Sequence, residues 1–117
     1  MEAVKTCKDK QKSASFEEAK ALCRDLYRVL NGVGIYPALT GGLLYKDGER
    51  KDIDIVLYRN RQQLQAFEIK DLEIVLKDIG IEITGHYGFV TKCTWRGFVV
   101  DLFNPETFEG GEYDDGE

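Results

Sequence analysis

Three aspartates, Asp52, Asp54 and Asp101, are the residues of this 117-residue chain best suited to chemistry. Asp52 and Asp54 alternate with Ile53 and Ile55, so that on a strand both carboxylates project from one face. Two neighbouring carboxylates repel each other unless a cation lies between them, and oxygen ligands of this kind suit Mg²⁺. The pair therefore predicts a divalent-cation site at the start of an apolar strand.

Asp101 extends the predicted site, because it lies within the strand-forming run of residues 98–103. Burying a lone carboxylate costs several kcal/mol unless a partner or a metal compensates its charge. A neighbouring strand that carries Asp52 and Asp54 would explain a buried acid here. Three carboxylates around two Mg²⁺ ions, with Mn²⁺ as a substitute, could orient a triphosphate and activate an attacking hydroxyl group.

Two consecutive glycines, Gly41 and Gly42, precede the acidic strand, and nine residues separate Gly42 from Asp52. Glycine allows a backbone to approach a phosphate closely. Together with the acids, the pair predicts a metal-dependent site for a nucleoside triphosphate such as ATP.

The ordered set of a Gly-Gly turn, an Asp-x-Asp strand and a later single aspartate resembles the nucleotidyltransferase superfamily, over about residues 16–104. That superfamily includes DNA polymerase beta and small minimal nucleotidyltransferases. The resemblance implies transfer of a nucleoside monophosphate from a nucleoside triphosphate to an acceptor hydroxyl group, with release of pyrophosphate.

The resemblance also implies a role for each motif residue. Gly41 and Gly42 would hold the phosphates through backbone amides. Asp52 and Asp54 would bind both metal ions, and Asp101 would bind one of them and accept the proton of the incoming hydroxyl group. Many members of the superfamily have serine where Gly42 stands, and Thr40 is a candidate to supply the missing hydroxyl group.

Basic residues flank the acidic strand, with Arg50 and Lys51 before it and Arg59 and Arg61 after it. Basic groups commonly balance the charges of a triphosphate that metals leave uncompensated. We expect Lys51 to contact the phosphates or to offset repulsion among the acids. The alternative for each of the four residues is an ordinary solvated charge.

The remaining pattern predicts an α+β fold, a mixed sheet flanked by two main helices, and the resemblance implies the same. Ser15 and Glu18 fit a capping box, and they precede a helix that ends at Asn31 and Gly32. A second helix is expected at residues 68–79, and strands at residues 35–40, 52–58, 81–84, 87–95 and 98–103. A simple hairpin over residues 36–58, with both glycines as loosened strand positions, is the alternative for the glycine region.

Composition indicates one domain at residues 15–104, after a flexible segment at residues 1–14 and before an acidic, disordered tail at residues 105–117. Six of the 21 acidic residues and none of the 16 basic residues lie in residues 104–117, so the remaining chain is nearly neutral. The sequence has no basic stripe of the kind that tight nucleic-acid binding requires. No apolar run approaches the ~20 residues that span a bilayer, and no secretory signal begins the chain, so we expect a cytoplasmic protein.

Three functions fit these observations. The first is an enzyme, a nucleotidyltransferase whose acceptor surface comes from a partner protein or a second copy in a homodimer, because the chain has no second domain. The second is a catalytically inert binding module of the same fold, for example an antitoxin-like regulator. The third is a plain α+β domain whose acids lie at exposed strand ends.

The single His86 is interpreted as an ordinary surface or turn residue.

Overall fold

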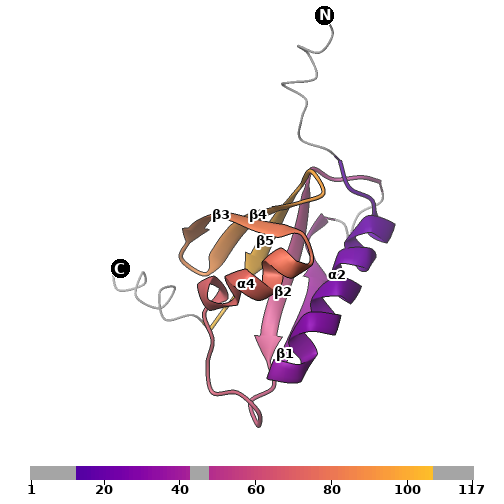
Figure 1. Cartoon of the computed structure of the whole chain (residues 1–117). Helices are drawn as coiled ribbons and strands as arrows, with labels where there is room; N and C mark the ends of the chain where they lie inside the picture. The colour runs from indigo at the N-terminus through magenta and orange to yellow at the C-terminus, as the bar shows by residue number, and fades with distance from the viewer. Residues whose placement is uncertain (1–12, 43–47, 107–117) are drawn as a thin grey trace, which may run out of the picture.

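The structure is a computed structural model that describes residues 13–42 and 48–106. Within these residues, five strands form one mixed sheet, and the helices α2 (Phe16–Leu30) and α4 (Glu73–Asp78) pack on the same face of it (Figure 1). The strands lie in the order β1-β2-β5-β4-β3. Their bounds are Ile35–Thr40 for β1, Asp52–Arg59 for β2, Ile81–Tyr87 for β3, Val90–Trp95 for β4 and Phe98–Phe103 for β5. The predicted α+β architecture is confirmed.

Helix α2 begins where the capping box predicted. The Ser15 backbone N–H donates to Glu18 Oε1 at 2.8 Å, and the Glu18 N–H donates to Ser15 Oγ at 3.3 Å. The helix ends at a 3₁₀ turn, η1 (Asn31–Val33), which leads into β1. Its fully buried side chains, which follow the predicted helical spacing, are Ala19, Leu22, Leu26 and Leu30.

The second helix is shorter than the predicted segment of residues 68–79. A 3₁₀ helix, η2 (Ile69–Leu72), precedes α4. Among the described residues, neither element has a side-chain cap at its N-terminus. A 3₁₀ turn is common at the start of an α-helix, and here the α-helix itself starts only at Glu73. The apolar face is nevertheless as predicted, because Ile69 and Leu76 are buried.

The turn between β3 and β4 also differs from the prediction, which ended the first strand at residue 84. Strand β3 continues to Tyr87, and the turn lies at Gly88 and Phe89. A register shift between Ile83 and Gly85 indicates a β-bulge, which allows the strand to continue through Gly85. The predicted turn at residues 96–97 is confirmed, and β4 and β5 form an antiparallel hairpin around it.

Strands β1 and β2 pair antiparallel from Ile35 opposite Arg59 to Thr40 opposite Asp54. The hairpin alternative is therefore correct about strand pairing. It is wrong about the glycines, because β1 ends at Thr40 and Gly41 begins the connection instead of occupying a strand position.

The sheet has one covered face and one open face. Along β2, Ile53, Ile55 and Leu57 are fully buried under the helices, and the alternate side chains project from the other face. Strands β2 and β5 run parallel. As a result, Asp54 of β2 lies beside Asp101 of β5 on the open face.

The edges of the described chain differ from the predicted domain limits. Ala14 is fully buried and forms a bridge with Arg50, although it was assigned to the flexible segment. Glu106 was assigned to the disordered tail, but it forms ion pairs with Arg59 and Arg61. The rest of the two predicted terminal segments lies largely outside the described residues. Among the described residues, no helix has the length and apolar character needed to cross a membrane.

Candidate active site

One row of residues crosses the open face of the sheet, with one residue from each strand. Thr40 is paired with Asp54, Asp54 with Asp101, Asp101 with Lys92, and Lys92 with Gly85. Neighbouring strands lie about 4.8 Å apart, so the carboxyl groups of Asp54 and Asp101 are immediate neighbours. The structure thus brings together two of the three predicted acids.

The three acids interact electrostatically. The pKa of Asp54 is raised, first because partial burial disfavours its charged form, then because of the like charges of Asp101 and Asp52. A hydrogen bond with Asp101 raises this pKa further, whereas Lys92 lowers it. Asp52 lies two residues before Asp54 on the same face of β2, next to the row but outside it. Repulsion within this group is what a bound cation would relieve.

Lys92 is a site residue that the sequence interpretation missed. Its Nζ donates to Asp101 Oδ1 at 3.0 Å, and the pKa of Lys92 is raised, chiefly by this hydrogen bond. The signal was present in the sequence, because a two-residue turn at residues 96–97 fixes the hairpin register. Counting outward from that turn places Lys92 opposite Asp101 on the same face.

The Gly-Gly turn lies directly against Asp54 and Arg50. Gly41 has a φ of +77°, and a Cβ at this position would lie 2.2 Å from Asp54 Oδ2. A Cβ at Gly42 would lie 2.8 Å from Arg50 Nε, at the flexible side chain of that arginine. The absence of side chains in the turn therefore allows its backbone to approach both the Asp54 carboxylate and a guanidinium group.

Gly41→Ala is expected to destabilise the protein more than Gly48→Ala. Both glycines have positive φ, at +77° and +92°, and a left-handed conformation costs an L-residue about 1–2 kcal/mol. Only at Gly41 does the added methyl group also collide with Asp54, whereas none of the described residues lies within 4 Å of a Cβ at Gly48. Urea denaturation of the two variants should separate the two costs, and equal losses of stability would show that the contact with Asp54 is not important.

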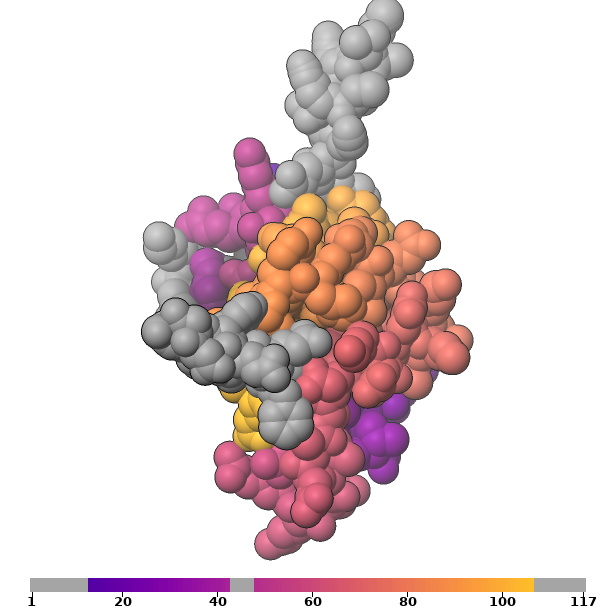
Figure 2. Space-filling model, turned by 90° about the vertical axis from the view of Figure 1, so that its left-hand side faces the viewer, coloured from indigo at the N-terminus to yellow at the C-terminus, as the bar shows by residue number. Residues whose placement is uncertain are grey.

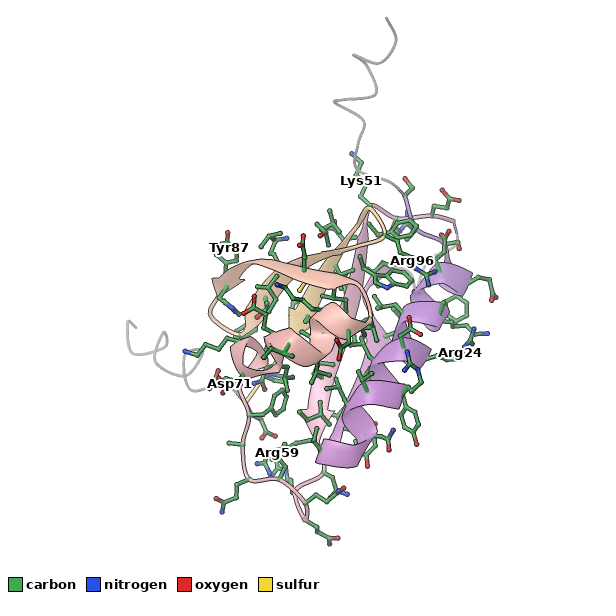
Figure 3. The ribbon with its side chains drawn as sticks, viewed as in Figure 1. Arg24, Lys51, Arg59, Asp71, Tyr87 and Arg96 are labelled. Atoms are coloured by element: carbon green, nitrogen blue, oxygen red, sulfur yellow. The ribbon has the colours of Figure 1, made fainter. Side chains whose placement is uncertain are left out.

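The four flanking basic residues divide into two groups. Lys51 and Arg50 lie at the end of β2 where the acids are, and Lys51 is exposed. Arg59 lies at the opposite end of the strand (Figure 3). Arg59 and Arg61 are bonded to Glu106, at 2.6 Å and 3.0 Å. Five residues of strand span about 17 Å, so Arg59 and Arg61 are excluded as phosphate ligands beside Asp54.

The donor types of the row fit a divalent cation, because carboxylate oxygens from two adjacent strands converge on one face. The described side chains, however, are not arranged as a complete set of metal ligands. In residues 13–42 and 48–106, no three His, Cys, Asp or Glu side chains are grouped so that they could hold a metal ion. One oxygen of Asp101 is instead bonded to the ammonium group of Lys92.

A separate hollow lies between the β3–β4 hairpin and the segment that leads into α4, two regions that adjoin in Figure 2. His86 and Thr91 line it, and His86 Nδ1 lies 3.0 Å from Thr91 Oγ1. Asn104 also lines it and donates to the backbone oxygen of Phe67 at 2.7 Å. His86 and Thr91 thus bond to each other, whereas Asn104 bonds to the Phe67 backbone. His86 is therefore in strand β3 and does not contribute to the acidic row.

No protein-family model matches the chain, and no curated protein matches it. Among solved structures, the fold of this chain is similar to that of Cid1. The structural plasticity of Cid1 is described as a basis for its RNA terminal uridylyl transferase activity. The TM-score is 0.52 at 15% sequence identity, and the similarity covers 99% of this chain and 42% of that chain. The chain thus spans less than half of the length of Cid1. At this identity the similarity shows the fold alone, and it confirms a nucleotidyltransferase-like fold.

Proposed function

We propose that the protein is a metal-dependent nucleotidyltransferase of the minimal type. It would transfer a nucleoside monophosphate from a nucleoside triphosphate to an acceptor hydroxyl group and release pyrophosphate. The observation that carries this proposal is the parallel pairing of Asp54 with Asp101, directly beside the glycine turn that follows β1. A plain domain with solvated acids has no reason to align two carboxylates on adjacent strands, one of them almost buried.

In this proposal the carboxylates have different roles. Asp52 and Asp54 would hold two Mg²⁺ ions, or Mn²⁺ ions in their place, and Asp101 would share one of them. When bound, the ions would neutralise the charge that develops on the transferred phosphoryl group. Asp101 would accept the proton from the acceptor hydroxyl group at its carboxylate. Its buried position on β5, between β2 and β4, holds that carboxylate in place.

The triphosphate would lie over the turn at Gly41 and Gly42, where backbone N–H groups can reach phosphate oxygens. Thr40 ends the neighbouring strand beside Asp54 and could add its hydroxyl group. Arg50 lies against Gly42, and Lys51 follows it in the chain, so both could balance phosphate charge. We propose that a partner protein or a second copy of the chain supplies the acceptor surface.

The second candidate is a catalytically inert module with the same fold. The ion pair between Lys92 and Asp101 favours it, because an ammonium group bonded to the proposed proton acceptor compensates its charge without a metal. The two candidates differ in turnover and not in fold.

Incubation of the protein with labelled nucleoside triphosphates, Mg²⁺ and co-purifying RNA or protein acceptors tests the first candidate. We expect label transfer and pyrophosphate release that both stop in EDTA and in Asp54→Asn. Glu82→Gln is a matched control, because Glu82 is an exposed acid at the β3 edge of the sheet and outside the row. Binding of Mg²⁺-triphosphate without transfer to any acceptor, with or without a partner protein, would favour the inert module.

A further inference from the structure

The pair formed by Lys92 and Asp101 has a geometry that bears on how the site is loaded. The two residues lie directly opposite each other on β4 and β5, and Lys92 Nζ is 3.0 Å from Asp101 Oδ1. The Asp101 side chain is 11% exposed and that of Lys92 is 45% exposed. The carboxylate is thus fixed within the sheet, whereas half of the lysine side chain is in solvent and can move.

Burial of Asp101 requires a compensating positive charge. Lys92 provides it through a charge-assisted hydrogen bond, which is the strong kind. A divalent cation on the same carboxylate would compete with this ammonium group, because the two positive charges repel at such short separation. Asp101 therefore cannot bind a metal ion at full strength while Lys92 remains bonded to it.

Asp52 and Asp54 are in a different electrostatic environment from Asp101. Asp54 faces two like charges, those of Asp101 and Asp52, and relief of that repulsion favours a first cation at Asp52 and Asp54. Lys92 lies on the far side of Asp101 from Gly41, because the strand order is β1-β2-β5-β4-β3. Its ammonium group is therefore on the side of Asp101 that is remote from the proposed triphosphate.

We propose that Lys92 is a positioning residue that acts as a resident counter-cation of Asp101, so that the nucleotide-free protein binds one divalent ion at Asp52 and Asp54. A second ion binds only when Lys92 leaves Asp101. This inference rests on the proposed function, since it concerns the loading of the same site. It assigns to Lys92 the control of metal stoichiometry, and the lysine itself is not a metal ligand.

The test is the number and affinity of Mn²⁺ ions bound by the nucleotide-free protein, measured by calorimetry and electron paramagnetic resonance. We expect one Mn²⁺ per chain in the wild type and in Lys92→Arg, which keeps the charge. Lys92→Met removes the charge but keeps most of the stem, and it should bind two ions, or bind Mn²⁺ about tenfold more tightly or better. Lys77→Met is the control for net charge, because Lys77 is exposed on α4, and it should behave as the wild type does.

Stability in EDTA is an independent readout. Lys92→Met should have a lower Tm than the wild type without metal, and Mn²⁺ should restore it. If that variant does not fold, the wild type still provides a test. Addition of Mg²⁺ together with a non-hydrolysable triphosphate should shift the side-chain NMR signal of Lys92, because the second ion binds only when Lys92 leaves Asp101, and the signal is assigned by its loss in Lys92→Arg.

The outcomes separate the two proposals. Equal Mn²⁺ number and affinity in the wild type and Lys92→Met would overturn the role of Lys92 and leave the proposed function intact. A Lys92 signal that Mg²⁺ with the triphosphate does not shift, in a protein that binds both, would have the same meaning. No Mn²⁺ binding by the wild type or by Lys92→Met would overturn the metal-dependent function and this inference with it.

Discussion

Asp101→Asn is expected to abolish nucleotidyl transfer and to retain much of the binding of Mg²⁺-triphosphate. Removal of a general base lowers a rate by about 10²–10⁴-fold, and the loss is larger when a metal ligand disappears as well. The amide of asparagine can still accept the hydrogen bond from Lys92, so the packing of β4 against β5 should survive. The measurement compares label transfer with equilibrium binding of a non-hydrolysable triphosphate.

Variants of Asp52 and Asp54 are expected to behave differently from Asp101→Asn. Asp52→Asn and Asp54→Asn should lose both transfer and binding, since those residues are proposed to hold the metal ions that bind the triphosphate. Glu82→Gln should lose neither. If Asp101→Asn lost binding as completely as Asp54→Asn, Asp101 would be a metal ligand of equal weight and not chiefly a proton acceptor. If it kept transfer, another group would have to accept the proton.

The local elements of this fold could be predicted because short-range chemistry determines them. The Ser15 and Glu18 capping box set the start of α2, and alternation of Asp52 and Asp54 with isoleucines set the two faces of β2. The order of the strands could not be derived from pattern, because β2 and β5 pair across more than forty residues of chain. That pairing depends on how the helices cover the sheet, which no local signal contains.

The site was predicted in part, and for the same reason. The acids and the glycines were expected together from their types and spacing, and Asp54, Asp101 and Gly41 do lie side by side. Arg59 and Arg61 were considered only as groups that could balance phosphate charge, with an ordinary solvated charge as the alternative, because nearness in sequence to an acidic strand says little when the strand itself separates its two ends. Their actual partner, Glu106, is more than forty residues away. Lys92 was missed although the turn at residues 96–97 fixed its register, because an isolated lysine in a strand is usually solvated.

Asp54→Asn is expected to have opposite effects on the protein without metal and with metal. Without metal it removes a charge that burial and two neighbouring acids disfavour, and the protein should become more stable. A gain on the order of 1 kcal/mol would raise the Tm by about 4 °C or more in a domain of this size. With Mg²⁺ the order should reverse, because a ligand at a hundredfold excess over its Kd stabilises the wild type by about 2.7 kcal/mol, and the variant should lose most of this.

The Tm difference between the wild type and Asp54→Asn in EDTA should depend on pH. The folded state raises the pKa of Asp54, so it favours the protonated carboxyl group, and that contribution is complete below the ordinary pKa of an aspartate. As the pH rises through the raised pKa, the wild type loses that stability, whereas the asparagine variant does not. The Tm difference in EDTA should therefore be largest at neutral pH and should vanish in acid. Asp71→Asn, at an exposed aspartate of η2 outside the row of Asp54 and Asp101 (Figure 3), should show no such difference. A wild-type Tm that is unchanged by millimolar Mg²⁺, together with an equal Tm for Asp54→Asn at neutral pH, would mean that the acids neither repel strongly nor bind the ion.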